Sequence, residues 1–312
     1  MNLYSGTPAI RSVPLQPSTP PPPPACPGTY QEAGSFDRQD YLLDPGLVAA
    51  LDTHMAMHYV PGLRLENQRG LLIVGEPGDG KSTTIKVHAS RRGIDVLQMP
   101  AADLCGATEG LAVQRLNEAC AYMHAKSAEA GRHMLFQLDD LDASIVDERK
   151  DQERTINSSL LIGKLQSLLE SPDACRDAMG IPIAFVFTAN TVANFRAPLL
   201  RDGRCQVFRY RPTWQWKADA QIHHLRPSTD RDRKRLRCLV YKYRIRPMAW
   251  FTALAADLKR AAIASAVAEH GLADHDAIVR AADQARLDVR ALFRLAKARH
   301  KATPITTEEV RS

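Results

Sequence analysis

The run from residue 71 to residue 83 decides the fold: Leu71-Leu72-Ile73-Val74-Gly75-Glu76-Pro77-Gly78-Asp79-Gly80-Lys81-Ser82-Thr83. It fits the pattern Gly-x-x-x-x-Gly-Lys-Ser/Thr, placed after an apolar strand and before a helical stretch. Glycines let backbone N–H groups converge on phosphate oxygens, and the N-terminus of the following helix adds partial positive charge. Lys81 would reach the β- and γ-phosphates, and the Ser82 hydroxyl would bind Mg²⁺. The run therefore predicts an ATP site across Gly75–Thr83.

Apolar strand patterns alternate with helical patterns around this run. Strands are predicted at 71–74, 94–99, 134–138, 183–188 and 206–210, and helices at 46–59, 82–92, 111–128 and 156–169. Such alternation forms a parallel sheet with helices on both faces. From residue 213 the pattern is helical, at 214–225, 228–243, 247–270, 274–284 and 288–300. We predict an α/β, doubly wound parallel sheet in residues 36–212, followed by a small all-helical lid domain in residues 213–312.

Two acidic residues follow the strand predicted at 134–138, in the stretch Leu138-Asp139-Asp140. Downstream of a phosphate loop this is the Walker B pattern, in which Asp139 would hold Mg²⁺ and Asp140 would polarise the attacking water. Taken alone, the two acids could instead cap a helix. The next strand ends at Asn190, which could orient that water near the γ-phosphate, although it could also be a turn asparagine.

The segment Ala197-Pro198-Leu199-Leu200-Arg201-Asp202-Gly203-Arg204 places two arginines three residues apart beside a glycine turn. Such a pair suits the edge of a subunit. There Arg201 and Arg204 would project into a neighbour's nucleotide and stabilise charge on the transferred phosphoryl group. In that case the protein works only as an oligomer. The alternative is a surface ion pair of either arginine with Asp202.

The composition is that of a globular protein: 312 residues, 45% hydrophobic and 24% charged. No apolar run reaches the ~20 residues of a membrane span, and the first residues lack a signal-peptide pattern. The six cysteines are scattered, without the paired spacing of a zinc site. We expect a soluble, cytoplasmic protein with no membrane partner. Residues 1–35, with five consecutive prolines at Pro20–Pro24, predict a disordered or polyproline II tail.

The net charge of +6 is concentrated in residues 201–246, which carry 14 Lys/Arg against 4 Asp/Glu. A basic stripe of this kind can bind nucleic acid, an acidic protein or phosphate. Tyr241 and Tyr243 lie within it and could stack on bases. The alternative is an ordinary solvated helix face.

The phosphate loop, Leu138–Ala143 and above all Ala197–Arg204 resemble rubisco activase, a remodelling ATPase of the AAA+ class. The resemblance runs from about residue 43 to residue 212 and returns at Met248–Leu254 in the lid. The Asp at position 140, where most AAA+ proteins have Glu, is shared with that family. The resemblance implies ATP hydrolysis in a ring or helical oligomer, with Arg201 and Arg204 acting on the neighbouring subunit.

Two features depart from that family. Plant activases carry a sizeable folded domain that engages rubisco ahead of the ATPase module, and we expect no counterpart of it in the Pro-rich residues 1–35. The segment Leu104–Gly110 occupies the place of the first pore loop but lacks the aromatic residue that many threading AAA+ machines use. The resemblance therefore extends to the ATPase module and leaves the client open.

The lid contains one further candidate. Leu287-Asp288-Val289-Arg290 resembles the sensor 2 segment of AAA+ lids, in which an arginine touches the nucleotide phosphates. Arg290 is the candidate and Arg294, one turn on, is the alternative. A surface arginine on an amphipathic helix would give the same pattern.

Three hypotheses of function follow. The first is an oligomeric AAA+ ATPase that remodels a protein client through the segments at 104–112 and 144–155. The second is an ATPase or loader coupled to nucleic acid through residues 231–246, which DNA or RNA would stimulate. The third is a nucleotide-gated scaffold that binds ATP with little turnover.

Overall fold

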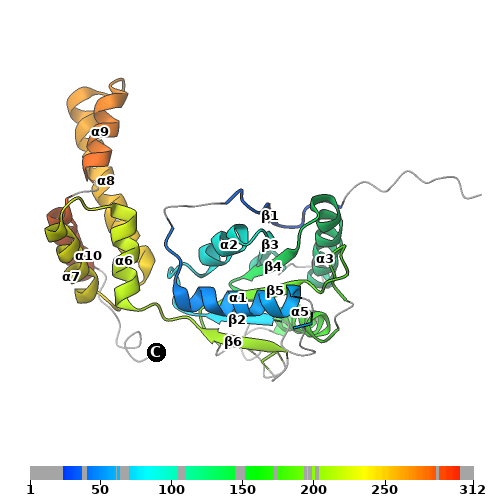
Figure 1. The fold of residues 1–312 in the computed structure, drawn as a ribbon. Helices are drawn as coiled ribbons and strands as arrows, with labels where there is room; N and C mark the ends of the chain where they lie inside the picture. Colours follow the sequence, from blue (N-terminus) through cyan, green and yellow to red (C-terminus); the bar gives the residue numbers. More distant parts are fainter. Residues whose placement is uncertain are drawn as a thin grey trace, which may run out of the picture.

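The computed structural model describes residues 24–36, 41–60, 62–63, 70–104, 110–144, 152–171, 174–192, 195, 199–200, 204–285 and 288–302. Side chains are described for these residues except 144 and 152–158. A sheet covered by helices forms the first part of the chain, and a group of helices follows it (Figure 1).

Six strands form one sheet in the order β1-β3-β4-β5-β2-β6. They are β1 (Thr29–Gln31), β2 (Gly70–Val74), β3 (Asp95–Pro100), β4 (Met134–Asp139), β5 (Ala184–Ala189) and β6 (Cys205–Arg209). Strands β2 to β6 pair in parallel, and β1 pairs antiparallel to β3. The carboxyl ends of β2, β4 and β5 therefore meet at one edge, where parallel α/β sheets bind their ligands.

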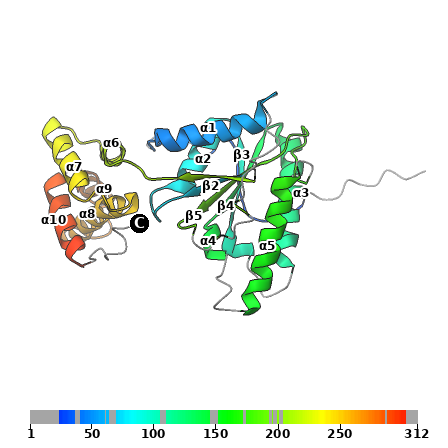
Figure 2. The ribbon, with the colours of Figure 1, turned by 90° about the horizontal axis from the view of Figure 1, so that it is seen from below.

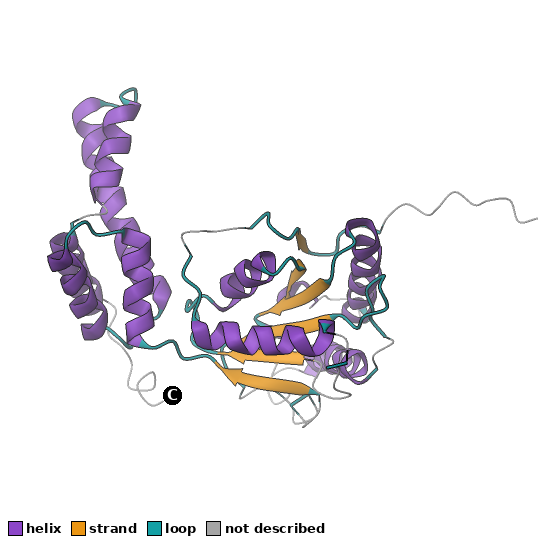
Figure 3. Cartoon of the chain, viewed as in Figure 1, coloured by secondary structure: helices purple, strands orange, loops and turns teal. Residues whose placement is uncertain are grey.

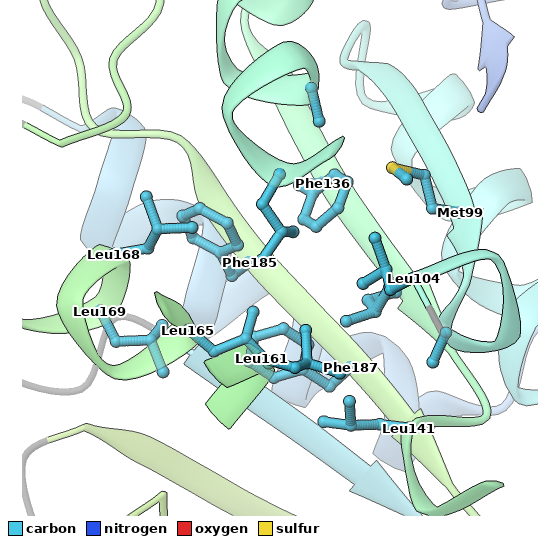
Figure 4. Packing of buried hydrophobic residues seen from close by; sticks show 14 of the residues in the cluster. Met99, Leu104, Phe136, Leu141, Leu161, Leu165, Leu168, Leu169, Phe185 and Phe187 are labelled. Carbon is cyan, nitrogen blue, oxygen red and sulfur yellow. The ribbon is translucent and has the colours of Figure 1, made fainter. Parts of the chain in front are cut away.

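Helices cover both faces of this sheet (Figure 2). On one face, α1 (Pro45–Tyr59) and α2 (Lys81–Arg91) pack against alternate strand residues such as Leu71 and Ile73. On the other face lie α3 (Leu111–Ala130), α5 (Gln152–Glu170), the 3₁₀ helix at Ala101–Leu104 and the short α4 (Leu141–Ser144). Phe136, Phe185 and Phe187 meet the leucines of α5 in this second core (Figure 4). The period of two along each strand is what separates the two cores.

The lid is wholly helical (Figure 3). It consists of α6 (Trp214–Leu225), α7 (Asp230–Lys242), α8 (Met248–His270), α9 (His275–Ala285) and α10 (Val289–Ala302). Leu236, Val240, Phe251 and Leu292 form its own core. The end of α8 pairs with α9 in a hairpin that projects beyond the other lid helices (Figure 1). None of the described helices is long and apolar enough to cross a membrane.

The predicted fold class is confirmed, because the described elements are a mostly parallel sheet followed by helices. The structure differs at the predicted tail, since its residues Thr29–Gln31 form β1. Tyr30 explains the difference. Its hydroxyl donates to the buried Asp95 carboxylate at 2.7 Å, and its ring meets Tyr122 edge to face. Such long-range contacts leave no periodic signal in a three-residue strand beside a Pro-rich run. Residues 1–23 lie outside the described part.

Candidate nucleotide-binding site

The phosphate loop runs from Gly75 to Gly80, between β2 and α2. Gly80 is the N-cap of α2 with φ +87°, in the left-handed region that glycine adopts readily, and no side chain caps the helix. The first backbone N–H groups of α2 are therefore left for a ligand. This is the geometry in which a helix N-terminus binds phosphate.

Lys81 is 6% exposed and folds back against the loop. Its Nζ donates to the backbone oxygens of Gly75 at 2.6 Å and Glu76 at 3.0 Å, and to Asn190 Oδ1 at 3.0 Å. Burial lowers the pKa of Lys81, and nearby carboxylates, Asp140 first among them, oppose this shift. A phosphate oxygen entering the loop would provide Lys81 with an anionic partner in place of these neutral oxygens.

Ser82 and Asp139 form a pair of oxygen ligands suited to Mg²⁺. Ser82 Oγ donates to Asp139 Oδ1 at 2.8 Å. The Asp139 carboxylate also accepts from Thr188 Oγ1 at 2.9 Å and from the amides of Gln137 and Gln98. All of these donors are neutral, so the negative charge of Asp139 is left for a cation. Residues Gln98, Gln137 and Thr188 were not among the predicted site residues, and a polar residue within an apolar strand was the available signal.

Asp140 follows directly and has φ +53°, one of two positive φ values among the described non-glycine residues. Its N–H donates to Thr188 Oγ1 at 3.0 Å, which holds this conformation. Burial, followed by the charges of Asp139 and Asp142, raises the pKa of Asp140, while Lys81 and a hydrogen bond from Asn190 lower it. The structure thus brings Lys81, Asp140 and Asn190 together at the carboxyl edge of the sheet.

Arg204 lies at the amino end of the parallel strands, away from the phosphate loop. Its carbonyl accepts from the N–H of Gly70, the first residue of β2. Its side chain donates through Nε to Glu170 Oε1 at 2.7 Å, at the end of α5. Among the described residues, Arg204 therefore forms an ion pair with Glu170. Arg201 and Asp202 lie outside the described residues, as do most of the segments 104–112 and 144–155 expected to face a client.

A cavity of about 430 Å³ opens between the phosphate loop and the lid. Tyr41, Leu42, Gly78, Gly80 and Thr83 line it from the first domain. The lid contributes residues of α6 and α8, among them Trp216, Gln221, Met248 and Ala249. Its position beside the loop suits the base and ribose of a nucleotide.

Two of the residues that line this cavity, Trp216 and Gln221, carry polar groups. Trp216 Nε1 is buried without an acceptor. Gln221 is 3% exposed and also lines the cavity. Buried polar groups in native proteins are nearly always paired. Trp216 and Gln221 are therefore polar side chains that a ligand in the cavity could contact.

Two further predictions concern lid residues, the arginine at 290 or 294 and Tyr243. Arg290 and Arg294 are exposed on α10, whereas the described lid residues that line the cavity come from α6 and α8. Neither arginine is among the described residues that line this cavity. Tyr243 was expected to be available for base stacking, but it is 5% exposed and packs in the lid core against Trp250.

Comparison with known proteins shows which protein family this chain resembles. The model of the family described as "ATPase family associated with various cellular activities (AAA)" matches residues 71–213. The chain is 25% identical over 202 residues to the ribulose bisphosphate carboxylase/oxygenase activase of Phaseolus vulgaris, covering 59% of this chain and 44% of that relative. It is 24% identical over 184 residues to the activase of Nostoc sp., and that match covers 55% of this chain and 43% of that relative. The chain spans less than half the length of these relatives.

The AAA ATPase class is therefore the one that residues 71–213 resemble, and the phosphate loop and the acidic pair lie within the matched part. Within this class, the chain resembles the rubisco activases, as its motifs predicted.

Proposed function

We propose that this chain hydrolyses ATP to ADP and phosphate with Mg²⁺, as an oligomer whose neighbouring subunits share each site. The observation that carries the proposal is the meeting of Lys81, Asp140 and Asn190 beside the Ser82–Asp139 pair. A phosphate anchor, a metal ligand pair and a carboxylate near a polar amide are the parts that phosphoryl transfer to water requires.

The residues would act in the following way. The loop N–H groups and the free N-terminus of α2 bind phosphate oxygens. Lys81 exchanges its backbone oxygens and Asn190 Oδ1 for phosphate oxygens, which frees the Asn190 amide. Asp140 accepts a hydrogen bond from the attacking water, and Asn190 orients that water. Mg²⁺ bound at Ser82 and Asp139 would neutralise charge on the β- and γ-phosphates.

Arg204 supports a shared site. Strand β2, which begins at Gly70 and has five residues, spans about 16 Å up to the phosphate loop. Arg204 lies at the Gly70 end, so it can reach a nucleotide only on another subunit. Its ion pair with the half-exposed Glu170 is of the kind that contributes little stability, and a phosphate could replace it. We assign Arg201 the same role on its sequence.

The client we propose is a protein. The relatives are named as activases of ribulose bisphosphate carboxylase/oxygenase, an enzyme, which supports a protein target without identifying it. A nucleic-acid client has less support, because Tyr243 is buried and Arg233, Arg235 and Arg237 of α7 form ion pairs within the lid. The scaffold hypothesis would leave Asp140 and Asn190 without a role.

The test is ATP hydrolysis measured against protein concentration, for the wild type beside Lys81→Ala, Asp140→Asn and Arg204→Ala. We expect turnover per subunit to rise with concentration and to be lost in all three variants. Mixing Arg204→Ala with Asp140→Asn should restore activity, since one variant supplies the intact site and the other the arginine. Tight ATP binding without turnover at any concentration would leave the scaffold. The same assay with Arg201→Ala tests the second arginine.

A further inference from the structure

Two residues of the phosphate loop contact the lid directly. Asp79 is 3% exposed, and its Oδ1 accepts from the N–H of Met248 at 2.9 Å. The same oxygen lies 3.3 Å from Nζ of Lys217 in α6. The carbonyl of Gly78 accepts from the N–H of Ala249 at 2.9 Å. The loop expected to bind phosphate therefore also holds the lid.

The contact with Met248 provides a hydrogen-bond acceptor for the first backbone N–H group of α8. The N-cap of this 23-residue helix is Pro247, which makes no side-chain cap. Asp79 and the Gly78 carbonyl accept from the first two N–H groups of the helix in its place. A carboxylate at a helix N-terminus is favoured by the helix dipole as well as by the hydrogen bond. Asp79 thus caps a helix of the other domain.

Lys217 compensates the charge of Asp79. Its side chain is 6% exposed, and its Nζ also donates to the carbonyl of Arg246 at 3.0 Å. Removing one partner of a buried ion pair leaves an uncompensated charge, which is far more costly than removing both. Each of these two residues therefore depends on the other.

Gly78 sets how closely the lid approaches. It has φ +84°, and a Cβ at this position would lie 2.7 Å from Cβ of Ala249. A side chain at position 78 would therefore push the start of α8 away from the loop, where the Asp79–Lys217 pair forms.

We propose that Asp79 and Lys217 are positioning residues, an ion-pair latch by which docking of the lid makes the phosphate loop competent to bind a polyphosphate. The proposal rests on the proposed function. Asp79 places a negative charge in the loop that receives phosphates, where it repels them unless the lid supplies Lys217. A docked lid thus raises the affinity for phosphates. By thermodynamic reciprocity, bound phosphates favour the docked lid to the same extent.

The test is the affinity for ATP, measured by equilibrium dialysis, with adenosine as a probe that lacks phosphates. We expect Lys217→Met to raise the Kd for ATP about tenfold or more, and the Kd for adenosine less than about threefold. The double variant Asp79→Asn/Lys217→Met should recover ATP affinity to within about threefold of the wild type, because both buried charges are gone. Arg237→Met, which breaks a half-exposed lid ion pair with Asp219, is the matched control and should change neither Kd.

Tryptophan emission gives a second measurement, because all three tryptophans (Trp214, Trp216 and Trp250) lie in the lid. Trp216 lines the cavity, so Trp216→Phe is the background that removes direct contact with a ligand. In it, ATP should change the emission, and Lys217→Met should abolish that change at saturating ATP.

Each outcome decides between the two proposals. A wild type that binds no ATP defeats the proposed function. A wild type that binds ATP while Lys217→Met retains wild-type affinity, or while Asp79→Asn fails to rescue Lys217→Met in a folded protein, overturns the latch alone. Circular dichroism of each variant establishes folding. If the double variant does not fold, Asp79→Asn alone, which retains the hydrogen bond to Met248, should also lose the ATP-dependent emission change.

Discussion

The Ser82 hydroxyl donates to Asp139 Oδ1 at 2.8 Å, which joins the start of α2 to the end of β4. In the proposed mechanism the two oxygens would hold one Mg²⁺. We expect Ser82→Ala to lower ATP hydrolysis by at least about tenfold at a fixed Mg²⁺ concentration, with partial recovery as Mg²⁺ is raised. Ser82→Thr keeps the hydroxyl and should remain active. A Mg²⁺ titration of turnover checks this, and equal Mg²⁺ dependence of all three proteins would contradict it.

Asp140 should set the acid limb of the activity profile. Its pKa is raised, chiefly by burial, and only its charged form can act as the base toward the attacking water. Turnover should therefore fall with decreasing pH at a higher pH than for an ordinary aspartate, whose pKa is about 3.9. Measuring kcat against pH tests this. Asp140→Asn should bind ATP and fail to hydrolyse it. An acid limb at or below the ordinary value would contradict the assignment.

Gln221 should favour adenine over guanine. Its amide offers one donor and one acceptor, which match the N6/N7 edge of adenine, whereas guanine presents two acceptors there. We expect Gln221→Leu to reduce the preference for ATP over GTP by about tenfold, mainly by weakening ATP binding. Gln215→Leu, at an exposed position of the same helix, is the control. Dialysis with both nucleotides measures the ratio, and an unchanged ratio would remove Gln221 from base recognition.

Tyr30 should stabilise the sheet edge. Its hydroxyl donates to Asp95, which is fully buried and also accepts from the N–H of Ala33 and from Arg132. Tyr30→Phe should lower the free energy of unfolding by about 1–3 kcal/mol, the usual range for a hydrogen bond to a charged group. Thr29→Ala, exposed on the same strand, should cost less. Urea unfolding compares them. Equal stability of all three proteins would show that β1 contributes nothing through this bond.

His54 should make stability fall in acid. It is fully buried, and burial, with the charge of His58 second, lowers its pKa to about 3. In the unfolded chain the His54 imidazole binds a proton near pH 6.5. Between pH 6.5 and about 3, protonation therefore lowers the free energy of the unfolded state and leaves that of the folded state unchanged. The contribution is a loss of about 1.4 kcal/mol per pH unit. Urea unfolding at pH 7 and pH 5 should show a smaller loss for His54→Gln than for the wild type. His270→Gln, at an exposed position, should keep the wild-type loss.

The sequence predicted the features that depend on neighbouring residues. The phosphate loop, the strand that ends in Asp139 and Asp140, and the helices of the lid are contiguous patterns, and all of them are present. The α5 helix begins at Gln152, earlier than the predicted residue 156, because its charged first turn carries no apolar period.

Features that depend on distant residues were not predicted. Thr188 and Asp139 meet because β4 and β5 are neighbours, and Asp79 meets Lys217 because the lid folds back on the loop. The helix that carries Arg290 was predicted, but the packing of α10 against α7 and α8 decides which of its residues are exposed. Local periodicity gives a helix its type and leaves its orientation to tertiary contacts.

The antiparallel strand β1 also determines how the sheet ends. With β1 on one side and β6 on the other, the described sheet terminates in strands of three and five residues. Arg204 precedes β6, Arg209 is its last residue, and Pro212 follows it. Short edges with charges and proline offer another chain few backbone groups to pair with. Copies of this protein would therefore associate through their side-chain surfaces, and the sheet would not grow from one molecule into the next.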